Sequence, residues 1–123
     1  MIDIHSHILP GLDDGAQDLF DTLEMVDMAA RNGVRTIIAT PHCNMPGEAL
    51  AYPEAQYKEC IQVVRNALWQ EGIPVTILAG AEALATPELP ELIKQGKIMT
   101  LNNSRYLLIE FLFAPTVPSA PNP

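Results

Sequence analysis

The chain is poor in basic residues and has no long apolar segment. Its 123 residues include 7 Lys and Arg against 15 Asp and Glu, which gives a formal net charge of −8. This balance argues against nucleic acid or an anionic membrane as the main partner. No apolar run approaches the ~20 residues needed to cross a bilayer. Before Asp3 there is also no leader in which charged residues are followed by an apolar stretch. We therefore expect a cytoplasmic protein without membrane insertion.

Cysteine is also scarce. Cys43 and Cys60 are too few for a disulfide framework and form no Cys-x-x-Cys pair. Phosphatases with a cysteine nucleophile carry an arginine six positions after it, where this chain has Ala49 and Asn66. Thiolate catalysis is therefore not expected.

What the chain does contain is an alternation of strand and helix patterns. Apolar β-branched runs predict buried strands, and apolar residues at 4-3-4 spacing predict amphipathic helices. Asp18 is the expected N-cap of the first helix, and Thr86 the expected hydroxyl cap of the third. The expected elements are strand 1–4, a helix ending near 32–33, strand 34–39, a helix around 57–68 ended by Gly72, strand 74–79, a helix from 86 to about 96, and the segments 97–101 and 106–111 around an Asn102-Asn103 turn.

This order predicts an α/β fold built from parallel βαβ units with right-handed crossovers. We expect one domain over residues 1–113, with the segment 106–111 as a buried strand. The last ten residues, 114–123, contain four prolines and are expected to form a disordered tail.

The three histidines all follow predicted strands. His5 and His7 close the first strand, where residues two apart point to the same face, and His42 follows the second. Glu82 and Glu110 fall at or beyond the ends of later strands. In parallel α/β folds, sites form at the carboxyl ends of strands, so these five side chains are expected to converge.

Each of these signals has a plain structural alternative. Histidines at strand ends often cap backbone groups, Asp13-Asp14-Gly15 has the composition of a simple turn, and Glu82 could be a solvated loop residue. Glu110 is harder to explain in this way, because a carboxylate within an apolar strand is costly unless it meets a cation or a firm hydrogen bond.

Imidazole and carboxylate donors together favour manganese, iron or zinc over calcium. Five or six ligands exceed what one tetrahedral zinc takes, so we expect a cluster of two or more divalent ions. Such clusters activate water and hold the attacking and leaving oxygens in phosphate ester hydrolysis.

Four segments resemble motifs of the PHP (polymerase and histidinol phosphatase) superfamily in the same order. They are MIDIHSHILPGLDDGA at 1–16, ATPH at 39–42, GAE at 80–82 and LNNSRYLLIEF at 101–111. The resemblance covers residues 1 to about 113. It is strongest to the manganese-dependent protein-tyrosine phosphatases of bacterial capsule and exopolysaccharide systems.

The resemblance implies a distorted, TIM-like (β/α)7 barrel with a trinuclear metal site, most readily filled by Mn²⁺. It implies metal contacts from His5, His7, His42, Glu82 and Glu110, with Asp14 as a ligand or proton-handling catalytic group. The implied reaction is hydrolysis of phosphotyrosine on a partner bacterial tyrosine kinase that regulates capsular or extracellular polysaccharide synthesis.

The family pattern continues with a His-Pro-Glu-Arg-like motif and a late Asp-x-His, whereas this chain has no histidine after His42. The chain thus resembles a barrel truncated after about its fourth core strand. We expect it to associate, with itself or with a complementary C-terminal segment, because its edge strands would be open. Two other functions stay open, namely a non-catalytic remnant that binds metal or kinase and a PHP phosphoesterase acting on a small phosphate monoester.

Overall fold

Parallel strand pairing organises the chain. The computed structural model describes residues 1–112, and the predicted tail at 114–123 lies outside them, as does the predicted domain boundary at 113. The strands are β1 (Ile2–Ser6), β2 (Thr36–Ala39), β3 (His42–Cys43), β4 (Thr76–Ala79), β5 (Glu82–Leu84) and β6 (Leu108–Glu110). The helices are α1 (Leu19–Arg31), α2 (Glu54–Glu71) and α3 (Leu89–Lys94), with a short 3₁₀ turn, η1 (Leu101–Asn103).

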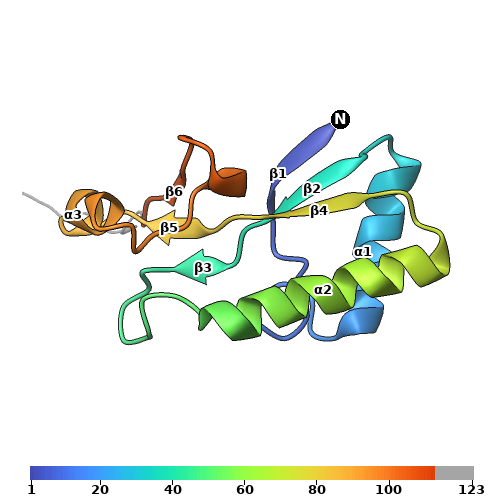
Figure 1. Cartoon of the computed structure of the whole chain (residues 1–123), viewed down its shortest axis with the longest axis horizontal. Coiled ribbons are helices and arrows are strands. Elements are labelled where there is room, and N and C mark those ends of the chain that lie inside the picture. The colour runs from blue at the N-terminus through green and yellow to red at the C-terminus, as the bar shows by residue number, and fades with distance from the viewer. Residues whose placement is uncertain (113–123) are drawn as a thin grey trace, which may run out of the picture.

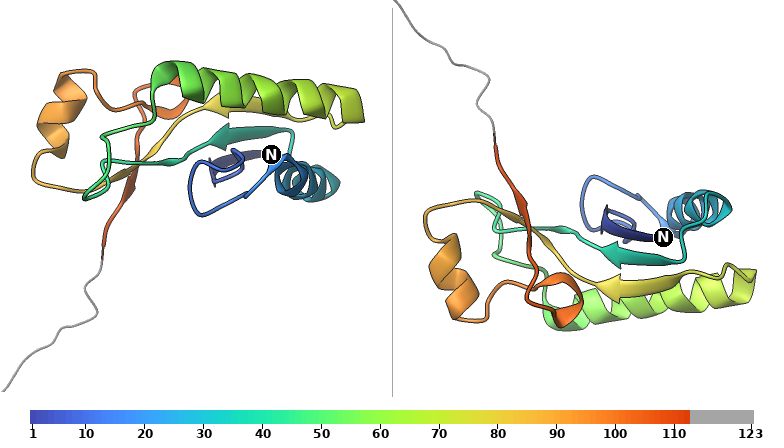
Figure 2. Two further views of the ribbon diagram at one scale, coloured as in Figure 1. Left: turned by 90° about the horizontal axis from the view of Figure 1, so that it is seen from below. Right: turned by 90° about the horizontal axis from the view of Figure 1, so that it is seen from above.

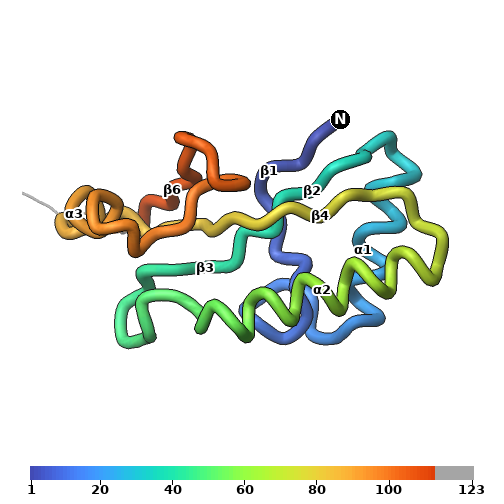
Figure 3. The backbone as a smooth tube through the Cα atoms, in the orientation of Figure 1, coloured from blue at the N-terminus to red at the C-terminus, as the bar shows by residue number. Residues whose placement is uncertain are grey.

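The strands form two small parallel sheets with the orders β1-β2-β4 and β3-β5-β6. The two sheets follow one another along the length of the molecule (Figures 1 and 3). β3 resumes the path of β2 after Thr40-Pro41, and β5 resumes that of β4 after Gly80-Ala81. The predicted α/β fold with parallel strands is therefore confirmed, whereas β3 and β5 are additional strands that the sequence patterns did not predict.

The ends of both long helices confirm the sequence signals. The Asp18 side chain accepts a hydrogen bond from the backbone N–H of Asp21 at 2.9 Å, which caps α1. α1 ends at Asn32, and α2 ends at Gly72, whose φ of 69° is the left-handed conformation that glycine adopts readily.

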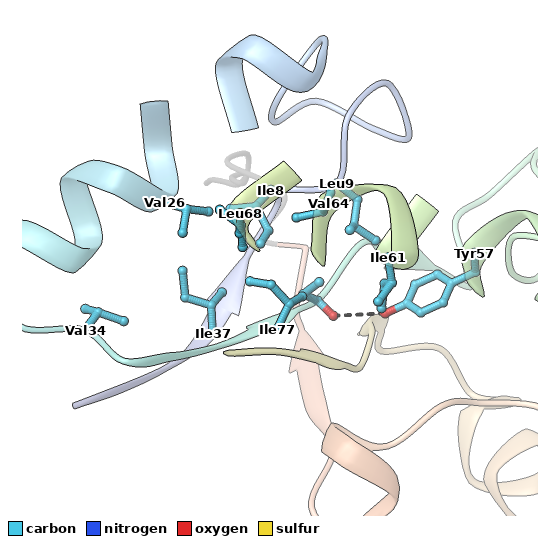
Figure 4. Packing of buried hydrophobic residues seen from close by; sticks show 11 residues of the cluster. Ile8, Leu9, Val26, Val34, Ile37, Tyr57, Ile61, Val64, Leu68 and Ile77 are labelled. Carbon is cyan, nitrogen blue, oxygen red and sulfur yellow. Dashed lines mark hydrogen bonds between the residues drawn. The ribbon is translucent and has the colours of Figure 1, made fainter. Parts of the chain in front are cut away.

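Both helices lie on one side of the β1-β2-β4 sheet, where they form the main core (Figures 2 and 4). The apolar stripe of α2 predicted from its spacing is buried throughout. The residues at the centre of this core come from α1, α2, β2 and β4, and they are Val26, Tyr57, Ile61, Val64, Leu68, Ile37 and Ile77. None of the helices in residues 1–112 has the length and hydropathy to cross a membrane.

Two local predictions toward the C-terminus are wrong. The Thr86 hydroxyl accepts a hydrogen bond from the Asn44 side chain instead of capping a helix, and α3 begins three residues later. The turn predicted at Asn102-Asn103 is present as η1, where both residues take positive φ angles. β6 is not a buried strand, since Ile109 is 39% exposed.

The first and last strands have one neighbour each within residues 1–112. β1 pairs with β2, and β6 pairs with β5. The side chains of Ile2 and Ile4 on β1 are 62% and 50% exposed, and Phe111 beyond β6 is 64% exposed. The open, apolar edges expected from the sequence are therefore present in the described part of the chain.

Candidate metal centre

Two breaks in strand pairing position the central residues of the site. They lie at Thr40-Pro41, between β2 and β3, and at Gly80-Ala81, between β4 and β5. His42 is the first residue of β3 and Glu82 the first of β5, and these residues are paired in the parallel register. The buried hydroxyl of Tyr57 fixes both breaks, because it contacts the Ala39 carbonyl at 3.2 Å and the Gly80 carbonyl at 2.8 Å. It also accepts a hydrogen bond from the Gly80 N–H at 3.0 Å. The parallel pairing of β2 with β4, together with the Tyr57 hydroxyl, thus brings the imidazole of His42 beside the carboxylate of Glu82.

The end of β1 is tied to the same region by Thr40, which is fully buried. The Thr40 N–H donates to the Ser6 carbonyl at 2.8 Å, and its hydroxyl oxygen accepts from the Ser6 N–H at 2.9 Å. These bonds place His5 and His7, which flank Ser6, against the start of β3.

All three imidazoles converge on one oxygen of Glu82. Glu82 Oε1 lies 2.9 Å from Nε2 of His7, 3.2 Å from Nε2 of His5 and 3.4 Å from Nδ1 of His42. The Nε2 atoms of His5 and His7 are 3.3 Å apart, so the two rings share a face as their spacing predicted. The Glu82 side chain is only 6% exposed, which makes it the buried anionic centre of this group.

Two further carboxylates border this centre. Glu110 Oε1 lies 3.6 Å from Nδ1 of His42, and Asp14 Oδ1 lies 3.4 Å from Nε2 of the same ring. Asp14 is 77% exposed, so it is the acidic group most open to solvent. The structure therefore brings all six predicted site residues together in three overlapping groups. Within each group, the donor atoms lie within 4.8 Å of one another.

Asp13 also belongs to this site, although sequence patterns assigned it no role apart from its neighbour Asp14. Its Oδ2 atom accepts from Nδ1 of His7 at 2.9 Å and from the backbone N–H of His42 at 3.0 Å. The pair Asp13-Asp14 was visible in the sequence, but turn composition does not tell which of two adjacent carboxylates turns inward.

The pKa values of this pair reflect the same contact. Burial by itself lowers the pKa of His7, but the hydrogen bond and charge of Asp13, with the charges of Glu82 and Asp14, outweigh it and raise that pKa. Burial raises the pKa of Asp13, but hydrogen bonds from His7 and the His42 backbone outweigh it and lower that pKa. Both shifts favour the charged forms, as expected where opposite charges meet.

The residues of the centre fit a divalent metal. Nδ1 of His42 and Oε1 of Glu82 are buried and have no hydrogen-bond partner in residues 1–112. Buried polar atoms without partners are costly, and here each faces other nitrogen or oxygen donors. A cation shared by these lone pairs satisfies both atoms, and imidazole with carboxylate is a donor set that divalent metals accept.

The cysteine beside the site is not suited to nucleophilic catalysis. Cys43, which follows His42, is buried, and burial together with the charge of Glu82 raises its pKa to about 11. A thiol in this state has little thiolate at neutral pH, which agrees with the expectation from the sequence.

Comparison with known proteins gives the family. Residues 1–119 match the family described as capsular polysaccharide synthesis, CpsB/CapC. The tyrosine-protein phosphatase YwqE of Bacillus subtilis is 42% identical over 113 residues, which are 92% of this chain and 44% of that protein. The tyrosine-protein phosphatase CpsB of Streptococcus pneumoniae is 37% identical over 111 residues, 90% of this chain and 45% of that protein.

The fold agrees with this match. A solved structure from work on YwqE of Bacillus subtilis and CpsB of Streptococcus pneumoniae, described as unique metal-dependent tyrosine phosphatases, superposes with a TM-score of 0.82 at 42% identity. It covers 92% of this chain and 45% of that one, so the chain spans less than half the length of its relatives. The chain belongs to the CpsB/CapC family of capsular polysaccharide synthesis proteins.

Proposed function

We propose that this chain carries the metal-binding part of a phosphotyrosine phosphatase, with Mn²⁺ as the preferred ion and iron or zinc as alternatives. The observation that supports it most directly is the convergence of three imidazoles on the buried oxygen of Glu82. The relatives named tyrosine-protein phosphatases and the metal dependence of the solved relatives support the same function.

The ligands we propose are five side chains, His5, His7, His42, Glu82 and Glu110. A divalent ion bound by them supplies Lewis acidity, which neutralises phosphate oxygens and lowers the pKa of water. The chain contributes a rigid arrangement of donors, because His42 and Glu82 are fixed by the strand register and His7 by Asp13. Asp14, exposed beside His42, is placed to accept or donate a proton, or to act as a further ligand.

The substrate we propose is phosphotyrosine on a protein, in particular a bacterial tyrosine kinase that controls capsular or extracellular polysaccharide synthesis. We place the protein in the cytoplasm, where such a kinase domain is accessible. We also propose that the two sheets are part of a distorted (β/α)7 barrel. The parallel register and the helices on one side of the β1-β2-β4 sheet support this arrangement.

Hydrolysis of a phosphotyrosine peptide tests this function directly. We expect Mn²⁺-stimulated, vanadate-insensitive release of phosphate that is lost in His5→Ala. Gln70→Ala is the control, because Gln70 is exposed near the end of α2, whereas the group around Glu82 lies on β1, β3, β5 and β6 and the loops beside them. Release of phosphate without added metal, or full activity of His5→Ala, would contradict the proposal.

Two arms of this experiment address the alternatives. Faster hydrolysis of a small monoester such as histidinol phosphate than of the peptide would favour a small-molecule phosphoesterase. Tight Mn²⁺ binding or kinase capture without phosphate release would favour a non-catalytic binding protein.

We further infer that the open edges of β1 and β6 are covered in the active assembly, by a second copy or by a complementary C-terminal segment. The exposed apolar side chains beside both edges support this inference. Sedimentation at micromolar concentration is the test, and a compact monomer with an active site would contradict it.

A further inference from the structure

Asp13 and Asp14 are adjacent in sequence but differ sharply in their surroundings. The side chain of Asp13 is 9% exposed, whereas that of Asp14 is 77% exposed. The two oxygens of Asp13 together accept three hydrogen bonds, from the His7 ring at 2.9 Å, the His42 backbone at 3.0 Å and the Gly15 backbone at 3.3 Å. These donors come from the residue after β1, from the first residue of β3 and from the turn itself, so Asp13 joins three separate segments.

We propose that Asp13 is a positioning residue, which sets the orientation of the His7 ring and of the His42 backbone without binding the metal itself. This inference rests on the proposed metal binding by His7 and His42. An ionised carboxylate only accepts hydrogen bonds, so Nδ1 of His7 must carry the proton. Nε2 of His7 is then the atom available for a metal, and it is the atom that faces Glu82 at 2.9 Å.

The backbone of the turn supports this role independently. A Cβ atom on Gly15 would lie 1.9 Å from the His7 carbonyl oxygen and 2.4 Å from the His7 Cβ. The N–H of Ala16 donates to that same carbonyl at 3.0 Å. The turn is therefore pressed against the backbone of His7, and Asp13 is held at a fixed distance from the ring that it contacts.

Asparagine and alanine at position 13 separate positioning from direct ligation. Asparagine keeps one oxygen that can accept from both His7 and His42, and it loses mainly the longer bond to Gly15. Alanine loses all three bonds. A positioning role therefore predicts rescue by asparagine, whereas a metal-ligand role predicts that both variants fail, because a neutral amide is a poor substitute for a carboxylate ligand.

The experiment compares wild type with Asp13→Ala, Asp13→Asn and Asp18→Ala as full chains. Mn²⁺ affinity is measured from the EPR signal of the free ion, and the His7 Nδ1–H proton is followed by ¹H–¹⁵N NMR in the metal-free and Zn²⁺-loaded chain. Asp18→Ala is the matched control, since it removes the cap of α1 and lowers the melting temperature without touching the site.

We expect Asp13→Ala to lower Mn²⁺ affinity about 10–100-fold and to abolish the slowly exchanging His7 signal. Asp13→Asn should recover most of the affinity and keep the signal, and Asp18→Ala should bind Mn²⁺ as wild type does. Equal loss in both Asp13 variants would overturn the proposal in favour of ligation. Wild-type binding with an unchanged His7 signal in Asp13→Ala would also overturn it.

Two further results remain decisive. If Asp13→Ala does not fold, the His7 signal and the affinity of Asp13→Asn decide the role, since retention supports positioning and loss contradicts it. If wild type binds no Mn²⁺, the proposed function fails. The His7 signal in the metal-free chain then tests positioning by itself, through its presence in wild type and its loss in Asp13→Ala.

Discussion

Glu82 Oε1 lies 2.9 Å from Nε2 of His7, yet it has no hydrogen-bond partner within residues 1–112. The imidazoles of His5 and His42 approach the same oxygen from other directions. A buried carboxylate oxygen surrounded by nitrogen donors that it does not bond is the geometry of a shared ligand. The first prediction follows from this relationship.

Glu82→Gln should nearly eliminate divalent metal binding. The substitution keeps the shape of the side chain but replaces its charge with a neutral amide, in a position that three imidazoles share. We expect Mn²⁺ affinity to fall by more than the roughly 100-fold that the loss of an outer partner can cause. Metal content after dialysis, measured by elemental analysis, checks this loss. The control is Glu71→Gln, on the exposed last turn of α2, which should keep the wild-type metal content.

Gly15→Ala should damage both stability and the site. The added methyl group would lie 1.9 Å from the His7 carbonyl, so the turn must move away from His7. We expect a loss of about 1–3 kcal/mol in unfolding free energy and weaker Mn²⁺ binding. Gly33→Ala has open space around its Cβ and a φ of +92°, so it should cost only the backbone strain of about 1–2 kcal/mol. Wild-type metal affinity in Gly15→Ala would show that this turn does not support the centre.

Tyr57→Phe should loosen the two breaks in the sheet. The lost hydroxyl leaves the buried N–H and carbonyl of Gly80 without this partner. We expect a cost of about 1–3 kcal/mol in unfolding free energy, measured by urea titration. Metal affinity should fall as well, because the breaks place His42 and Glu82. An unfolding free energy equal to that of wild type would mean that the hydroxyl bonds contribute nothing net.

Alkaline pH should remove the contribution of the Tyr57 hydroxyl. Burial, partly offset by the hydrogen bond from the Gly80 backbone, raises the pKa of Tyr57 to about 12. The folded chain therefore holds this proton more tightly than the unfolded chain, whose tyrosine titrates near its ordinary value of about 10. The stabilisation is fully present below about pH 10 and is lost as the pH rises toward about 12.

The comparison with Tyr57→Phe isolates this effect from other groups that titrate in the same range. The difference in unfolding free energy between wild type and Tyr57→Phe should shrink between about pH 10 and 12. A difference that stays constant across this range would show that the Tyr57 pKa is the same in both states.

The long helices and central strands could be predicted because one physical signal dominates each of them. Asp18 caps α1 and Gly72 ends α2, where local backbone chemistry decides the structure. The convergence of His5 and His42 on Glu82 was also predictable, since all three lie at or just beyond the carboxyl ends of β1, β2 and β4, and such ends lie along one edge of a parallel sheet. Their separation in sequence did not matter, because strand order alone carries this information.

The remaining differences depend on contacts that sequence patterns do not contain. Thr86 was expected to cap a helix, but its hydroxyl accepts a hydrogen bond from the side chain of Asn44, which is 42 residues away in sequence. β6 was expected to be buried from its apolar residues, yet burial of Ile109 requires a neighbour that residues 1–112 do not supply. Asp13 and Asp14 have the same chemistry, and only the folded turn shows that the first faces inward.

Glu110 is a ligand candidate on an edge strand of the second sheet. Its strand, β6, pairs with β5 through three residue pairs and has no strand on its other side in the described chain. Strands with few neighbours open more readily than central ones, and each opening carries the Glu110 carboxylate away from His42. Ion uptake and closure of this border of the sheet are therefore linked equilibria. A bound ion would stabilise the pairing of β6 with β5, so β6 would separate from β5 less often as the ion concentration rises.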